Sequence, residues 1–292
     1  MIPEDRSSFL RNLLPPRLRL QIKTILVKNG CWNNSALTGK GVINDLYYWV
    51  SDENLDTLLP LQNYFSVFFP DLETETSGTI SLYDPKGRRL GARSIQIGAH
   101  QLVKLRVSDL LRELRVRVPE GYGTLLCDLR IPEAVLNFLD PDEPFYFWDR
   151  FYLGYLSKGN QPCFVHGVDK TTISHVGRTR MGLFYPAGRG TTWYPEIPVT
   201  LGLYKRFSVI LTNRTNRPAP LTLTVSDSRD ASRSWSNVIH PFGVHRFELD
   251  AENTRGLDPE EMRLRVDGIP SRWGRPVVFK EFHSGAISAM HC

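Results

Sequence analysis

The densest group of chemically versatile side chains lies near the middle of the chain, between residues 161 and 175. Cys163, His166, Asp169 and His175 are all side-chain types that ligate metal ions, and Cys163 with His166 could also supply a nucleophile and its base. A structural zinc site usually takes its ligands as two close pairs, which this spacing does not provide. Residues three apart on a strand point to opposite faces, so co-ligation by Cys163 and His166 would require a turn at Gly167.

The same segment is also typical of a plain β-hairpin. In that interpretation Phe164, Val165 and Val168 enter the core, and His166 bonds to backbone. The chain contains neither a G-x-S-x-G nucleophile turn nor a glycine-rich phosphate-binding loop. We therefore predict a non-enzymatic protein without a cofactor. A metal-dependent enzyme built on residues 163–175 stays open as a third hypothesis.

Alternation of apolar and polar residues, rather than helical periodicity, dominates the rest of the chain. Residues 18–23, 102–107 and 114–118 each place apolar side chains on one face and mostly cationic ones on the other. Such segments, separated by Gly, Pro, Asn and Asp, are typical of antiparallel β-sandwiches. We predict an all-β chain of two tandem, immunoglobulin-like antiparallel β-sandwich domains. Short helices are expected at residues 108–115 and 258–262, where Ser108 and Asp258 could act as N-caps.

The two halves of the chain resemble one another. Three segments recur in the same order, 65–67 at 207–209, 79–84 at 222–227 and 95–105 at 239–249. In the second pair, each segment is an alternating strand that ends in an Asp before a turn. This pattern indicates an internal duplication. The predicted organisation is a basic N-terminal tail over residues 1–17, a first β-sandwich over 18–145 and a second over 146–292.

Charge and composition narrow the class of protein. The net charge is +5, and residues 1–145 carry 17 basic and 18 acidic side chains, whereas residues 146–292 carry 19 and 13. A hydrophobic content of 41% excludes a disordered chain, and four widely spaced cysteines predict no disulfide framework. No apolar run approaches the roughly 18 residues of a membrane-spanning helix, and no secretory signal is evident. We expect a cytoplasmic protein.

Two segments have the composition of a partner-binding surface. Near the N-terminus, apolar side chains recur with helical spacing among arginines, which suits a partner groove or an anionic membrane surface. Residues 178–233 hold nine basic side chains against three acidic ones, with exposed-looking aromatic residues among them. Trp, Tyr and Arg are frequent anchors of protein interfaces. The predicted interface residues are Phe9, Leu10, Leu13, Leu14, Arg17, Arg178, Arg180, Arg189, Trp193, Tyr194, Arg214 and Arg217.

In size and in its basic, β-rich layout, the chain resembles the membrane-extrinsic linker subunits of bacterial photosynthetic reaction-centre and light-harvesting complexes. The resemblance is one of layout and carries over no functional residue. It implies a scaffolding subunit that binds acidic surfaces of partner proteins, peripheral on the cytoplasmic face of the inner membrane. The alternative is a carbohydrate- or nucleic-acid-binding module, because Trp, Tyr and Arg also stack on sugars and bases. We rank protein contact first and expect neither nucleic acid nor a small-molecule substrate as the main partner.

Overall fold

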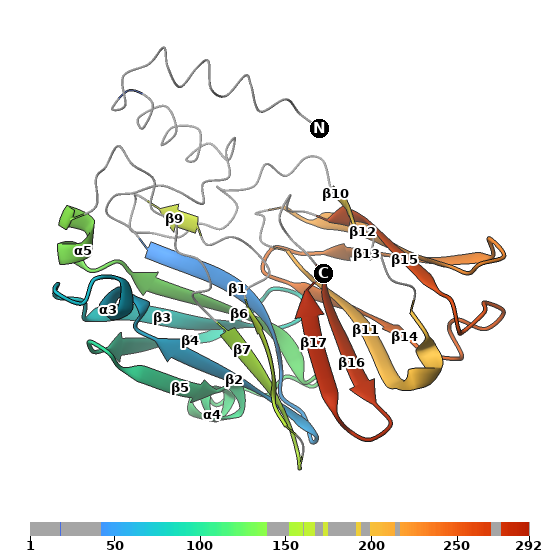
Figure 1. The fold of residues 1–292 in the computed structure, drawn as a ribbon, viewed down its shortest axis with the longest axis horizontal. Helices are drawn as coiled ribbons and strands as arrows, with labels where there is room; N and C mark the ends of the chain where they lie inside the picture. The colour runs from blue at the N-terminus through green and yellow to red at the C-terminus, as the bar shows by residue number, and fades with distance from the viewer. Residues whose placement is uncertain are drawn as a thin grey trace.

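The computed structural model describes residue 18 and residues 42–138, 152–159, 161–166, 172–174, 191–193, 199–213, 217–269 and 276–291. Within these ranges the chain is mostly β-strand, arranged in small antiparallel sheets with a few short helices (Figure 1). The prediction of an all-β chain is confirmed. Among the described residues, no helix is both long and apolar enough to cross a membrane.

The elements occur in two series along the chain. The first comprises β1 (Val42–Val50), β2 (Leu55–Gln62), α3 (Tyr64–Phe68), β3 (Thr76–Tyr83), β4 (Arg89–Ile97), β5 (Leu102–Arg106), α4 (Val107–Glu113), β6 (Tyr122–Arg130), α5 (Glu133–Phe138), β7 (Tyr152–Ser157) and β8 (Cys163–His166). The second comprises β9 (Thr172–Ser174), β10 (Thr191–Trp193), η2 (Leu201–Leu203), β11 (Tyr204–Thr212), β12 (Ala219–Ser226), β13 (Ser232–Ile239), β14 (Val244–Leu249), β15 (Arg263–Ile269), β16 (Val277–Phe282) and β17 (Ile287–His291).

These strands form four sheets, which we name after one strand of each. The β1 sheet has the order β4-β3-β6-β1-β9, and the β2 sheet has the order β5-β2-β7-β8. The β12 sheet has the order β10-β15-β12-β13, and the β11 sheet has the order β14-β11-β16-β17. Apart from β9, the strand order of the first two sheets repeats in the last two, with β1–β8 replaced by β10–β17. The two halves therefore share one topology.

Polar side chains at matching places fix this topology in both halves. Asn63 follows β2, and its side-chain amide donates to Thr74 O at 2.7 Å and to Gly98 O at 3.1 Å. Asn213 follows β11 in the same way and donates to Arg217 O at 2.8 Å and Ile239 O at 2.9 Å. Each asparagine thereby joins the end of its strand to backbone beside the neighbouring hairpin, where a buried carbonyl without a partner would be costly.

The turns of these hairpins are also built alike. The carboxylate of Asp84 accepts hydrogen bonds from the backbone N–H groups of Lys86 and Arg88 at 2.9 and 2.8 Å. The carboxylate of Asp227 accepts from the N–H groups two and four residues further on, at 2.9 and 3.1 Å. An aspartate that caps its own turn in this way sets the register of the strands on either side.

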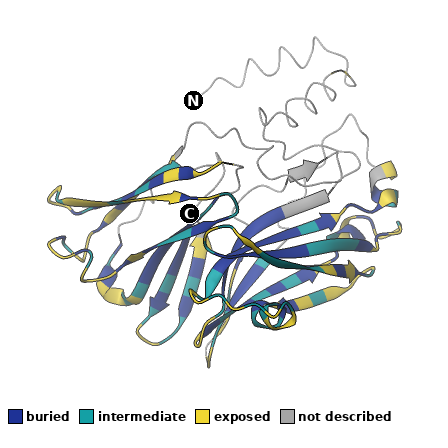
Figure 2. Ribbon diagram, turned by 180° about the vertical axis from the view of Figure 1, so that it is seen from behind, coloured by how far each residue is buried: buried dark blue, intermediate teal, exposed yellow. Residues whose placement is uncertain are grey.

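The apolar core is not divided between two separate domains. One cluster lies between the β11 and β12 sheets, with Phe207, Leu223 and Phe247 among its members. A larger cluster lies between the β1 and β2 sheets and also includes Ile210 and Phe279, which belong to the β11 sheet. The β11 sheet therefore contributes one face to each core, and buried residues run continuously through the strands of both halves (Figure 2).

This sharing corrects the prediction of two tandem immunoglobulin-like domains. The strand orders differ from the ABED and CFG sheets of an immunoglobulin fold. The predicted boundary between residues 145 and 146 lies outside the described residues. However, β7, which follows that position, pairs with β2, which precedes it, and β8 pairs with β7 in the same sheet.

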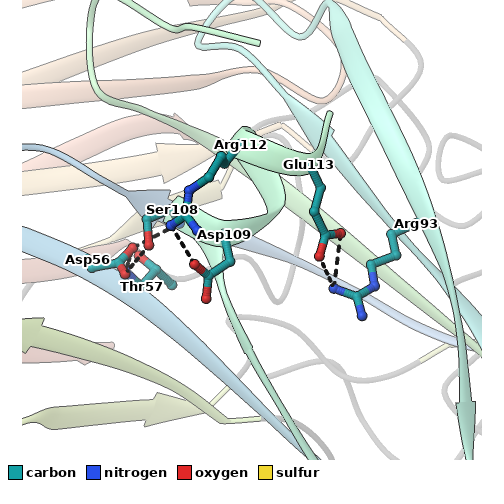
Figure 3. Close-up of polar contacts among 7 residues, drawn as sticks. All are labelled: Asp56, Thr57, Arg93, Ser108, Asp109, Arg112 and Glu113. Atoms are coloured by element: carbon teal, nitrogen blue, oxygen red, sulfur yellow. Dashed lines mark hydrogen bonds and ion pairs between the residues drawn. The ribbon is translucent and has the colours of Figure 1, made fainter. Parts of the chain in front are cut away.

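A carboxylate on β2 positions the helix that follows β5. Asp56 accepts hydrogen bonds from the Ser108 backbone N–H at 3.1 Å and from the Ser108 hydroxyl at 2.7 Å (Figure 3). It therefore caps the first turn of α4, which has no cap from its own N-cap side chain. Pairs of Arg112 with Asp109 and of Arg93 with Glu113 hold the exposed side of the helix. The helix predicted near residue 108 is confirmed, whereas residues 258–262 form no helix.

We expect Asp56→Ala to lower the free energy of unfolding by about 1–2 kcal/mol, because the amide of Ser108 loses its acceptor. The measurement is urea unfolding followed by circular dichroism. Asp109→Ala is the matched control, since the side chain of Asp109 is 48% exposed and pairs with the exposed Arg112. Its expected effect is below about 0.5 kcal/mol. Equal effects of the two substitutions would contradict the capping role of Asp56.

Candidate docking face on the β2 sheet

The β2 sheet presents one face to the core and the other, its outer face, away from it. Along β2, Leu55, Thr57, Leu59 and Leu61 are buried, and the residues between them are half-buried or exposed. The outer face consists of Asp56, Leu58, Pro60 and Gln62 on β2, Leu102, Lys104 and Arg106 on β5, Tyr152, Gly154 and Leu156 on β7, and Phe164 and His166 on β8. Much of this face is apolar although it does not face the core.

Phe164 is the most prominent apolar side chain of this outer face. It pairs with Gly154, and its ring lies over that glycine, because a Cβ atom built on Gly154 would come 2.7 Å from the ring. Leu58 follows next across the sheet. Even so, 49% of Phe164 is exposed to solvent. A large aromatic side chain fixed on a flat sheet and half exposed is the kind of residue that anchors protein interfaces.

The β5 edge of the outer face is positively charged. Lys104 and Arg106 are exposed, and neither has an ion pair or side-chain hydrogen bond within the described part of the chain. The carboxylate of Asp56, on the neighbouring strand, is already engaged by Ser108. The two cations therefore stand beside the apolar strip without a neutralising partner in these residues. Such an edge attracts a negatively charged surface.

The corresponding face of the second half is covered by the first half. Phe279 and Ala289 on the β11 sheet occupy the positions that Gly154 and Phe164 occupy on the β2 sheet, and both are buried. The ring of Phe279 contacts the ring of Tyr155 edge-on, with centroids 5.3 Å apart. The same face of the same sheet is therefore buried in one half and partly exposed in the other.

A cluster of tyrosines around one arginine lies in the joint between the halves. The Arg246 guanidinium lies 4.5 Å from the centroid of the Tyr122 ring, donates to the Tyr48 hydroxyl at 3.4 Å, and pairs with Glu248 at 2.8 Å. The Tyr155 hydroxyl donates to Tyr48 O at 3.0 Å. Burial raises the pKa of Tyr48 to about 12 and also raises the pKa of Tyr155. These perturbed groups hold the two halves together.

Two turns complete the joint. Phe242 stacks on Tyr83 with centroids 4.8 Å apart, and the Val244 N–H donates to Pro85 O at 3.0 Å. Gly87 has a φ of +78°, and a Cβ atom there would lie 2.0 Å from Pro241 O. A glycine is therefore required both by the backbone conformation and by the close approach of the second half. Contacts this close fix the relative position of the halves.

Of the four predicted metal ligands, the structure describes Cys163 and His166, and it places their side chains on opposite faces of β8. Cys163 and His166 lie on β8, where Cys163 packs beside the core and His166 lies on the outer face, with its ring 6.2 Å from that of Tyr152. Burial raises the pKa of the Cys163 thiol. Asp169 and His175 lie outside the described residues. Within those residues, no three His, Cys, Asp or Glu side chains are grouped to hold a metal ion.

The predicted interface residues lie mostly outside the described ranges. Those outside are Phe9, Leu10, Leu13, Leu14, Arg17, Arg178, Arg180, Arg189, Tyr194 and Arg214. Trp193 pairs with Val266 through its backbone at the edge of the β12 sheet, and Arg217 is exposed just before β12. Sequence reasoning missed the outer face of the β2 sheet. The available signal was the run Leu58-Leu59-Pro60-Leu61, where apolar residues fall on both faces of one strand.

Comparisons with known proteins give little further information. No protein-family model and no curated protein matches the chain. Solved structures that match the chain do so weakly, and two of them serve as examples. One is a calcium-binding mutant of Bacteroides uniformis beta-glucuronidase 2, with 10% identity, a TM-score of 0.21, and coverage of 89% of this chain and 27% of that one. The other is a glycosyl hydrolase family 2 member from Bacteroides cellulosilyticus, with 8% identity, a TM-score of 0.16, and coverage of 87% and 27%. The chain spans about a quarter of these structures, and similarity at this level supports no conclusion about function.

Proposed function

We propose that this chain is a non-enzymatic scaffolding protein that binds a partner protein through the outer face of its β2 sheet. One observation carries the proposal. The equivalent face of the β11 sheet is buried against a folded surface, while the face on the β2 sheet leaves Phe164 half exposed on β8 and has Lys104 and Arg106, without ion pairs in the described residues, on β5 at its other edge. Because this face packs against a protein surface in the second half, we expect the equivalent face of the first half to bind a protein surface as well.

We infer that the two halves arose by duplication of one eight-stranded unit of two facing antiparallel sheets. The repeated strand order supports this, as do the matched roles of Asn63 with Asn213 and of Asp84 with Asp227. In such a tandem, each unit has one face able to receive its neighbour. The second unit uses that face within the chain, and the first unit has it available for another molecule.

The charge of the outer face favours a partner with acidic groups near an apolar centre, because Lys104 and Arg106 lie along one edge. Among such partners, we propose the subunits of a membrane complex, as the layout of the sequence suggests. A carbohydrate- or nucleic-acid-binding module remains the second proposal, and the fractionation described next distinguishes them.

The test is gentle native fractionation of cells that produce the chain, with mass spectrometry of the proteins that comigrate with it. We expect the wild type in an assembly with other proteins, and a Phe164→Glu variant to be displaced from it, with at least tenfold less bound. The reason is that a charge would replace the large exposed apolar side chain of the docking face. High salt should weaken the same association.

Val238→Glu provides the matched control. Val238 is also 49% exposed, but it lies on β13 at the far edge of the other half. This variant should stay in the assembly, and circular dichroism should show all three proteins folded. Migration of the wild type without other proteins would refute the scaffolding proposal, and sugars and polyanions would then be tested as ligands. Retention of the Phe164→Glu variant would place the contact elsewhere.

A further inference from the structure

We infer that a second copy of this chain binds where the β2 sheet meets α3, so that the protein forms a symmetric dimer. The inference deepens the proposed function by naming one partner of the docking face. It rests on a second charged and apolar surface that lies next to the first and carries the opposite charge.

The second surface is formed by α3 and the loop that follows it. Val67 and Phe68 on α3 are 53% and 50% exposed, although each is a large apolar side chain. The loop after the helix carries Asp71, Glu73 and Glu75, all exposed. None of these three carboxylates has an ion pair or side-chain hydrogen bond within the described part of the chain. This end of the first half is therefore apolar and acidic.

Hydrogen bonds join this acidic end to the start of β5. The Asn63 N–H donates to Gln101 O at 3.0 Å, and the His100 N–H donates to the Ser66 hydroxyl oxygen at 2.9 Å. The Ser66 and Thr74 hydroxyls are 2.7 Å apart, which ties the acidic loop to α3. These contacts place Leu102, the first residue of β5, beside α3. Leu102 is 48% exposed.

The order of chemistry along this surface is therefore basic, apolar, acidic. Lys104 and Arg106 follow Leu102 along β5, and Ser66 of α3 links His100, just before β5, to Thr74, which lies between Glu73 and Glu75. A surface with this order is complementary to itself after a two-fold rotation. In a symmetric dimer, a contact between one residue of the first copy and a different residue of the second is repeated with the copies exchanged. Every contact therefore occurs twice.

Such a dimer would pair charged groups that have no ion pair within the described part of the chain. With Leu102 and Val67 near the two-fold axis, Lys104 and Arg106 of each copy face the acidic loop of the other. The apolar residues are then removed from water, and the charges are paired around them, as in the polar rim of a protein interface. A flat anionic membrane would pair only the basic side and would repel the acidic side.

Sedimentation velocity of the full chain tests this inference. We expect a concentration-dependent shift from a 33.4 kDa monomer to a species of twice that mass, between about 1 and 100 µM. Leu102→Glu should weaken dimerisation at least tenfold, because it puts like charges together at the axis. Dimerisation should also weaken as salt rises, since the rim contacts are ionic.

A charge exchange gives the sharpest version of the experiment. The pair Lys104→Glu and Arg106→Glu should weaken dimerisation at least tenfold, and so should the pair Glu73→Lys and Glu75→Lys. Combining all four substitutions in one chain should restore it, because opposite charges again face each other. Arg263→Glu is the control, since Arg263 is an exposed arginine on β15 of the other half, and it should leave dimerisation unchanged.

Several outcomes would overturn the inference. A monomer at every concentration would do so, and so would a dimer that is indifferent to Leu102→Glu and to both charge reversals. Binding to vesicles of phosphatidylserine and phosphatidylcholine without dimerisation would identify a membrane as the occupant instead. The native fractionation is independent of this result. A monomer in sedimentation that still enters an assembly through Phe164 would refute only the dimer, whereas a dimer that migrates with no other protein would refute only the broader scaffolding role.

Discussion

Phe279→Ala is expected to lower the free energy of unfolding by about 3–5 kcal/mol, and to do so for both halves of the chain together. Phe279 is buried on the face of the β11 sheet that closes the core of the first half. Its replacement leaves a cavity against Tyr155, which its ring now contacts. Because the β11 sheet also forms one wall of the second core, the damage cannot stay within one half.

The measurement is urea unfolding with a probe in each half, for example amide hydrogen exchange at β6 and at β12. We expect a single transition, shifted to lower urea for both probes. The matched variant is Phe247→Ala, which removes a buried ring from the opposite face of the same sheet. It should shift the same single transition by a similar amount. Two separate transitions, each moved by only one of the substitutions, would show that the halves unfold independently.

The repeat could be found from the sequence only where the two halves keep the same turns. The match of residues 79–84 with 222–227 is correct, because Asp84 and Asp227 cap equivalent turns between β3 and β4 and between β12 and β13. The match of 65–67 with 207–209 is wrong. Residues 65–67 lie on α3, which follows Asn63, whereas Phe207 lies on β11, which precedes the matching Asn213. A helix present in only one half shifts any alignment based on a few identities.

The shared core was not predictable, because the outer face of the β11 sheet has the composition of a solvent-exposed face. It carries Arg206, Arg246, Glu248 and Glu281, which a period-two pattern assigns to water. In the structure, these charges pair with one another, Arg246 with Glu248 and Arg206 with Glu281. Their pairing lets apolar neighbours such as Phe279 be buried between them. Alternation shows that a strand has two faces, but it does not show what covers each one.

The docking face was missed for a related reason. In β8, Cys163 and Val165 point inward and Phe164 and His166 point outward. Every residue of β8 is apolar or weakly polar, so the sequence does not show which alternate side chains face the core. The prediction placed Phe164 in the core. The direction in which Phe164 points is decided by pairing with β7, where Gly154 leaves room for its ring. The predicted strand at residues 114–118 failed differently, because Leu114 and its neighbours continue from α4 into a turn.

Raising the pH from about 10 toward 12 is expected to destabilise the chain through the tyrosines of the joint. Burial raises the pKa of Tyr48 from 10.0 to about 12 and also raises the pKa of Tyr155. The folded chain therefore favours the protonated phenols. Their contribution is complete below pH 10, the range of a tyrosine in the unfolded chain, and is lost as the pH rises through the folded-state pKa values. For Tyr48 alone the loss is about 2–3 kcal/mol.

The measurement is the free energy of urea unfolding at several pH values from about 9 to 11.5, with tyrosinate absorbance recorded in parallel. Lysines also lose protons in this range, so the informative quantity is the difference between variants. Tyr48→Phe cannot ionise, and its stability should fall less steeply with pH than that of the wild type. Tyr152→Phe, which removes a half-buried phenol from the outer face of the β2 sheet, should follow the wild type. If Tyr48→Phe also follows the wild type, the hydroxyl of Tyr48 ionises freely in the folded chain, and the Arg246 cluster is more open to water than the structure indicates.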